Sequence, residues 1–96
     1  MSVYVDHAFA AGEWGRWTGG GHLQADSLEE LRWFAAKLGL RSEWLQSKPG
    51  RPEKDHYDLD ARRRALALVL GAIPESRRDG ARRRRAVREA LVKGRA

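Results

Sequence analysis

The chain has no cysteine among its 96 residues, which excludes several kinds of protein at once. It cannot form disulfides, thiolate metal sites or a cysteine nucleophile, and it fits a reducing compartment. Runs of apolar residues long enough to cross a bilayer are also missing. Asp6 and His7 break up the apolar N-terminal stretch, so no secretory signal is expected. We therefore expect a cytoplasmic protein without a membrane partner.

Charge is distributed unevenly along the chain. Residues 77–96 carry nine Arg or Lys and two acidic residues, a net charge of +7, whereas residues 1–76 carry ten basic and eleven acidic residues, a net charge of −1. A chain of this size forms one domain with a small core. We expect a compact domain over residues 1–76 and an arginine-rich helix or tail over residues 77–96, with a homodimer as one way to complete the small core.

Apolar periodicity predicts a mixed α and β fold. Residues 2–6 and 22–25 alternate as strands do, and residues 72–74 favour a third short strand. Ser27 and Glu30 form a capping box before a helix that Gly39 ends. A buried helix is predicted over residues 59–70, capped by Asp58 or Asp60, followed by a turn and a last helix over residues 81–93. The fold class is thus α/β or α+β, with about three strands in a small mixed sheet and two to three packed helices.

Five polar residues lie where a site could form. His22 and His56 stand at the starts of predicted elements, with Asp6 ending a strand and Tyr57 and Asp58 following His56. Two neutral imidazoles and a carboxylate can hold a divalent metal. Alternatively, one imidazole can act as base and the other as acid in phosphoryl transfer. A purely structural interpretation is also open, in which Asp58 caps the helix, His56 packs at its start and Tyr57 fills the core edge.

The stretch RRDGARRRRAVR and the four tryptophans suggest further contacts. Arginines in this stretch can bind nucleic-acid phosphates or form only a solvated helix face; the candidates are Arg82, Arg83, Arg84, Arg85 and Arg88. The tryptophans can stack on bases when exposed. We expect at least two of them to enlarge the small core instead.

The segments VYVD, HLQAD, LEELRWFAAKLGL, WLQ, HYDL and RRALALVLGAI together resemble domain of unknown function family 4031, found in bacteria and phages. The resemblance covers about residues 2–73. It implies a shared polar site whose recurring positions are Asp6, His22, Asp26, Gln46, His56, Tyr57, Asp58 and Arg64. The chain departs from the family pattern at residues 19–21, where three glycines lengthen the interval between Trp17 and His22, and at Arg32, where histidine is common.

Three functions are compatible with these features. The first is a His/Asp site, with catalytic roles for His22, His56, Asp58, Tyr57 and Asp6, that binds or acts on a nucleotide or nucleic acid with or without a divalent metal. The second is a non-catalytic module of phage or mobile-element type that docks a host protein. The third is a nonspecific nucleic-acid binder that acts through its arginine-rich C-terminus.

Overall fold

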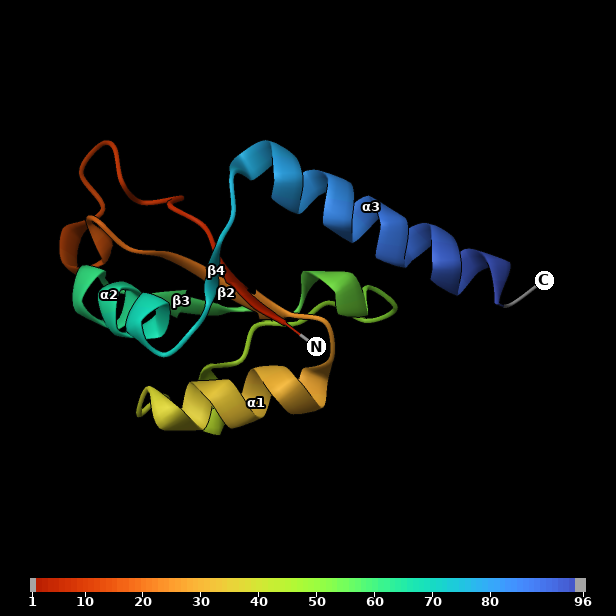
Figure 1. Cartoon of the computed structure of the whole chain (residues 1–96), viewed down its shortest axis with the longest axis horizontal. Coiled ribbons are helices and arrows are strands. Elements are labelled where there is room, and N and C mark those ends of the chain that lie inside the picture. Colours follow the sequence, from red (N-terminus) through yellow and green to blue (C-terminus); the bar gives the residue numbers. More distant parts are fainter. Residues whose placement is uncertain (1, 95–96) are drawn as a thin grey trace.

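A computed structural model describes residues 2–94 of the chain (Figure 1). Strands β1 (Val3–Val5), β2 (Gly21–Ala25), β3 (Tyr57–Leu59) and β4 (Ile73–Pro74) form a mixed sheet in the order β3-β2-β1-β4. β1, β2 and β3 are antiparallel, and β4 runs parallel to β1. The helices are α1 (Leu28–Lys37), α2 (Ala61–Val69) and α3 (Arg77–Lys93), with 3-10 turns at Gly15–Trp17, Ser42–Trp44 and Pro52–Lys54.

The predicted α+β class is confirmed, with four strands where about three were expected. The additional strand is β3, which the sequence placed at the start of a helix. Its alternation of Tyr57, Asp58 and Leu59 is only three residues long, too short to outweigh the helical pattern that follows. Asp60, not Asp58, caps α2 by accepting a hydrogen bond of 2.8 Å from the Arg63 amide. Of the two expected caps the structure uses Asp60, so the structural interpretation in which Asp58 caps the helix is wrong.

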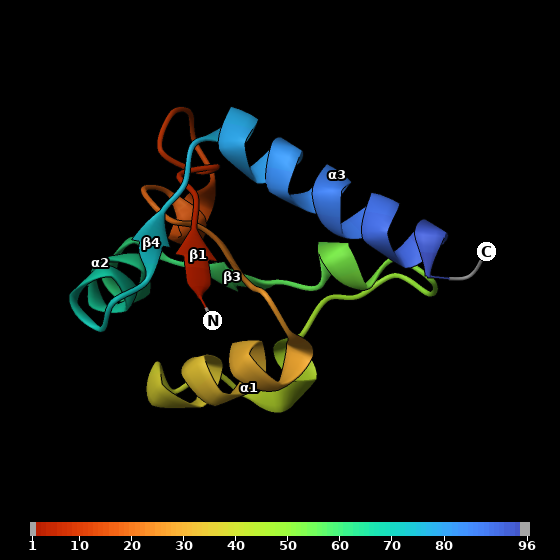
Figure 2. The same cartoon turned by 45° about the vertical axis from the view of Figure 1, so that its right-hand side comes forward.

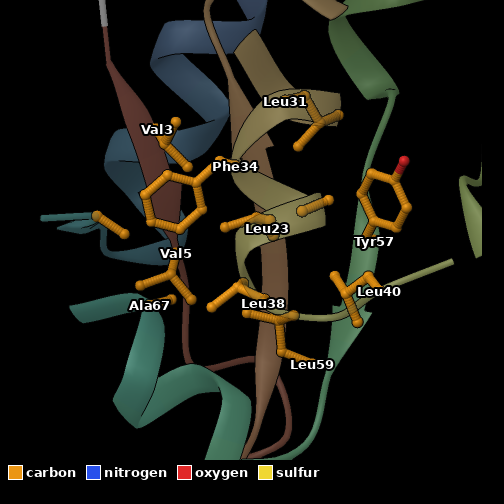
Figure 3. Packing of buried hydrophobic residues seen from close by; sticks show 12 residues of the cluster. Val3, Val5, Leu23, Leu31, Phe34, Leu38, Leu40, Tyr57, Leu59 and Ala67 are labelled. Carbon is orange, nitrogen blue, oxygen red and sulfur yellow. The ribbon is translucent and has the colours of Figure 1, made fainter. Parts of the chain in front are cut away.

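The hydrophobic core lies between one face of the sheet and α1 (Figure 3). Successive strand residues point to opposite faces, so β1, β2 and β3 all turn their apolar positions toward α1. Helix α1 packs its apolar side chains against this face, as its sequence predicts. Its N-cap is Ser27, whose side chain accepts a hydrogen bond from the Glu30 amide. The buried residues of this face and of α1 include Val3, Val5, Leu23, Leu31, Phe34, Leu38, Tyr57 and Leu59.

Helix α2 is less buried than its sequence suggests. Ala67 is its only buried residue, whereas 81% of Val69 is exposed. Leu66 and Leu70 are 41% and 43% exposed, so the predicted burial of this helix is wrong. The predicted homodimer remains a prediction. Among residues 2–94, no helix combines the length and apolar character needed to cross a membrane.

Helix α3 lies on the side of the sheet opposite α1 (Figure 2). Its contacts with the sheet are polar: Arg83 forms two bonds to the Glu75 carboxylate and, like Arg84, donates a 2.8 Å hydrogen bond to the Gln24 side-chain oxygen. The helix begins at Arg77, capped by Ser76, where the sequence predicted a turn. The predicted tail ran to residue 96, and residues 95–96 lie outside the described part. One sheet face is thus apolar and the other is polar beneath an arginine-rich helix.

Candidate functional site

Strand pairing places two of the predicted site residues directly opposite each other. In the antiparallel register of β2 and β3, His22 pairs with Asp58. His56 lies two residues before Asp58 and is held by a backbone bridge to Gln46, so its side chain points to the same face. The His22 and His56 rings are 4.9 Å apart between centroids and nearly perpendicular. The polar face of the sheet therefore gathers both imidazoles around one carboxylate.

Asp6 fixes the orientation of His22. Its Oδ2 lies 3.0 Å from Nδ1 of His22, while its Oδ1 accepts the backbone amides of His22 and Ala8. A carboxylate only accepts hydrogen bonds, so Nδ1 of His22 carries the proton and Nε2 faces Asp58 at 3.7 Å. Burial alone raises the pKa of Asp6, but these hydrogen bonds outweigh it and lower the pKa to about 2. The same hydrogen bond to Asp6 raises the pKa of His22.

A backbone carbonyl orients His56 in the way that Asp6 orients His22, through a hydrogen bond at Nδ1. Its Nδ1 lies 2.9 Å from the Lys54 carbonyl oxygen, which can only accept, so Nδ1 is again the donor. Nε2 of His56 then faces Asp58 Oδ1 at 3.6 Å. The other oxygen of Asp58 accepts a 2.7 Å hydrogen bond from Gln46. Two Nε2 atoms and one carboxylate oxygen are thus directed at the same small volume.

This arrangement has the chemistry of a metal ligand set. One donor atom each from His22, His56 and Asp58 lies within 4.8 Å of the others. The separations of 3.6 and 3.7 Å exceed normal hydrogen bonds. They are close to the roughly 3.3 Å expected between neighbouring ligands of a tetrahedral ion with bonds of about 2.0–2.1 Å. Each Nδ1 also bonds a carboxylate or carbonyl, the usual outer partners of metal-bound histidine.

A cavity of about 320 Å³ opens beside the cluster. His22 and His56 form part of its wall, and the remaining side chains are mostly polar or cationic. Arg84 reaches this wall from α3 and bonds Gln24, which is itself buried. Phe9 covers another side of His22: the two ring centroids are 5.1 Å apart, and the rings meet edge to face. The other lining residues are Asp6, Gln24, Gln46, Ser47, Lys48 and Lys54.

Residues 3–87 match the family described as "Protein of unknown function (DUF4031)". The chain belongs to this family. No curated protein and no solved structure matches the chain. The match extends beyond the predicted body into α3, so it includes Arg84 as well as the whole ligand set.

Most of the polar positions implied by the DUF4031 resemblance converge in space. Asp6, His22, His56, Asp58 and Gln46 form the cluster, and Arg64 donates to the Asp6 backbone carbonyl at 2.8 Å. Asp26 lies apart, where it accepts from the Ser2 amide and the Tyr4 hydroxyl.

Tyr57 does not join the cluster. It belongs to the opposite face of β3 and is only 1% exposed in the core, as the structural interpretation of this residue expected. Nothing in its position brings the phenol toward the two histidines. Its contribution to this DUF4031 member is therefore packing.

The five arginines of α3 that the sequence analysis proposed as phosphate contacts divide into two groups. Arg83 and Arg84 contact Gln24, and Arg88 donates to the Gly50 carbonyl oxygen at 2.6 Å. Arg82 and Arg85 are exposed. The sequence analysis treated all five alike, as candidate phosphate contacts. The cavity residues Lys48 and Lys54 were missed, because they lie in a charged loop whose sequence has no regular spacing.

The four tryptophans all lie outside the buried core, so the expectation that at least two enlarge it is wrong. Trp14, Trp33 and Trp44 are 48%, 60% and 42% exposed, and Trp17 is half-buried. Trp14 packs on Phe9 at 5.1 Å between ring centroids, and Lys37 lies 3.6 Å from the Trp33 ring. Their rings cover loops and helix surfaces instead of filling the space between α1 and the sheet.

Acid is expected to remove the stabilisation that Asp6 provides. Its pKa falls from 3.8 to about 2 on folding, so the contribution of about 2 kcal/mol is present above pH 3.8 and disappears as pH falls through 2. The raised pKa of His22 has the opposite pH dependence. The stability that protonated His22 contributes is complete below pH 6.5 and is lost as pH rises through the pKa of His22 in the folded protein. Urea unfolding of metal-free protein should show the difference between wild type and Asp6→Asn shrinking from pH 5 to pH 2. A difference that stays constant would contradict this assignment.

Proposed function

We propose that this DUF4031 protein binds a divalent metal at His22, His56 and Asp58 and uses it to act on a phosphate ester of a nucleotide or nucleic acid. The proposal rests on one observation: the Nε2 atoms of His22 and His56 both point toward Asp58 Oδ1. Their Nδ1 atoms are held by Asp6 and by the Lys54 carbonyl oxygen, respectively. A helix cap or a solvated surface would not need this double orientation.

The donor set indicates which ions would fit. Two imidazoles and one carboxylate suit Zn²⁺, Mn²⁺, Co²⁺ or Fe²⁺ better than Mg²⁺ or Ca²⁺, which prefer oxygen ligands throughout. Three protein ligands leave coordination positions for water and substrate. Such an ion would polarise a phosphoryl oxygen and lower the pKa of bound water. Asp6, Gln46 and the Lys54 carbonyl would hold the ligands in orientation.

The surroundings of the cluster favour an anionic substrate. Arg84 lines the cavity beside His22 and His56. It also lines a space on the Phe9 side of Asp6 and His22. Lys48 and Lys54 line the first cavity as well. Arginine recognises phosphate through its planar fork of donors, and lysine contributes a point charge. Three cations around a cavity with two histidines in its wall are suited to a phosphate group held next to the ion.

The proposal is tested first on the wild-type chain. Protein stripped with a chelator should bind Mn²⁺, Zn²⁺ or Co²⁺ with a stoichiometry of one in calorimetry, and Co²⁺ should give visible absorption typical of nitrogen and oxygen ligands. The loaded protein should hydrolyse bis(p-nitrophenyl) phosphate, and Arg84→Gln should raise KM with metal affinity unchanged. Absence of stoichiometric binding of all three ions would refute the site. Binding without turnover of this diester or of a single-stranded oligonucleotide would refute the catalytic part.

A second candidate function rests on the outer face of α3. Arg78, Arg82 and Arg85 are exposed and follow one another at intervals of four and three residues, which places them on one side of a helix. Such a row can follow a phosphate backbone without reading sequence. This function needs neither histidine, so it would survive loss of the cluster and would weaken steeply with salt.

A further inference from the structure

A second cavity lies next to the Gln46–Asp58 pair. It measures about 250 Å³, and Asp58 and Gln46 form one part of its wall. Gln46 also lines the cavity that holds the two histidines. Gln46 is therefore shared by the two cavities, and its 2.7 Å hydrogen bond joins it to Asp58 in the wall of the second. The remaining lining residues are Arg16, Trp17, Leu40, Trp44 and Arg63.

This second cavity is lined by aromatic rings, whereas the first is lined by polar and cationic side chains. Trp17 and Trp44 contribute indole rings that the hydrophobic core does not use. Arg16 lies over Trp17 at 4.6 Å, and Arg63 lies 5.9 Å from the Trp44 ring. Leu40, which is 9% exposed, provides a buried apolar surface. Indole faces, a guanidinium plane and an apolar floor are the surfaces on which nucleobases stack.

The size and position of the cavity restrict what it can hold. Pockets for drug-sized ligands measure roughly 300–1,000 Å³, so 250 Å³ suits one planar ring system better than a long chain or a peptide segment. Gln46 offers an amide near the ring edge, and Arg63 is anchored by its bond to the Leu38 carbonyl oxygen. A base held here would lie next to Asp58, and Gln46 would separate it from the cationic cavity, whose wall it also forms.

We infer that the cavity between Trp17 and Trp44 is a nucleobase subsite, so that the substrate of the metal cluster is a nucleotide unit with its base in this cavity and its phosphate toward Arg84. The inference rests on the proposed function for the position of the phosphate. The base-stacking surface itself depends only on the two tryptophans and their arginines. A mononucleotide and the end of a single strand would present the same base and phosphate.

The experiment compares ligands with and without a base. Trp44→Leu keeps an apolar side chain at a partly exposed position, and Trp33→Leu is a matched control on α1, where Trp33 contacts Lys37 instead. Using Mn²⁺-loaded protein, we expect Trp44→Leu to weaken AMP about tenfold and ribose 5-phosphate by less than twofold. Trp33→Leu should change neither affinity. Equal weakening of both ligands, or unchanged AMP affinity, would overturn the subsite.

Two further arms separate this inference from the metal proposal and identify the source of the base. Adenosine carries no phosphate and needs no metal, so its binding to metal-free protein should still weaken in Trp44→Leu even if the cluster binds no ion. Adenosine binding that is insensitive to Trp44→Leu would overturn the subsite whatever the metal result. A single-stranded tetranucleotide that binds more tightly than AMP would assign the subsite to strand ends; the reverse order would assign it to mononucleotides.

Discussion

Replacing His56 with alanine is expected to abolish stoichiometric metal binding, with a loss of affinity of more than about 100-fold. Partners outside the ligand shell already cost 10–100-fold when they are removed, and His56 would supply one of only three protein ligands. Its side chain is 25% exposed and makes one hydrogen bond, to the Lys54 carbonyl oxygen. The domain should therefore remain folded. Asp58→Asn, which keeps the shape and removes the charge, should have an effect of the same order.

The chain offers controls at graded distance from the proposed ion. Asp6→Asn should weaken binding by an intermediate factor of about 10–100-fold, because Asp6 orients His22 without facing the ion itself. His7→Ala removes the third histidine, which is exposed and outside the ligand set, and should change affinity less than twofold. Calorimetry of the four variants should give this order. Equal affinities across the series would show that the histidines are held together for structure alone.

The order of effects depends on a register that the sequence does not reveal. His22, Asp6 and Asp58 could each be identified as polar residues near element ends, and periodicity was enough to place α1 and three of the four strands. Whether His22 faces Asp58 depends on which residues of β2 and β3 pair. That register is set by burial of Leu23, Tyr57 and Leu59 on the other face, since a shift by one residue would expose all three.

Local patterns failed where tertiary contacts decide the outcome. Tyr57–Leu59 is a strand because β2 offers it an edge and the core accepts Tyr57 and Leu59. Helix propensity favours continuing α2 toward them, and tertiary packing overrides it. Helix α3 illustrates the same limit. Its arginines form one basic run in the sequence, yet Arg83 is held by Glu75 and Gln24, partners that lie eight and 59 residues away.

The glycine triplet at residues 19–21, which departs from the family pattern, is explained by close backbone approach. Gly20 and Gly21 are buried. A Cβ on Gly20 would overlap the Leu59 carbonyl oxygen, and one on Gly21 would overlap the Asp6 carbonyl oxygen. The triplet therefore lets the chain pass between the ends of β1 and β3. It also lets β2 begin at the point where His22 meets Asp6 and Asp58.

Gly20→Ala is accordingly expected to destabilise the domain by about 3 kcal/mol or more, at the upper end of what overpacking costs. The overlapping atom belongs to the backbone of β3, so no side-chain rotation can relieve the clash. Domains of this size have only about 5–15 kcal/mol of total stability. Urea unfolding monitored by tryptophan fluorescence should show a large drop in midpoint. Because β3 carries Asp58, metal affinity should fall together with stability.

Gly50→Ala separates this clash from the general cost of losing a glycine. Gly50 lies in an exposed loop with φ of 74°, and a Cβ there meets nothing within 4 Å. An alanine at this left-handed position costs roughly 1–2 kcal/mol through backbone strain alone. A Gly20→Ala variant no less stable than Gly50→Ala would mean that β2 and β3 can separate at little cost. The position of His22 opposite Asp58, on which the metal site depends, would then not be enforced by the sheet.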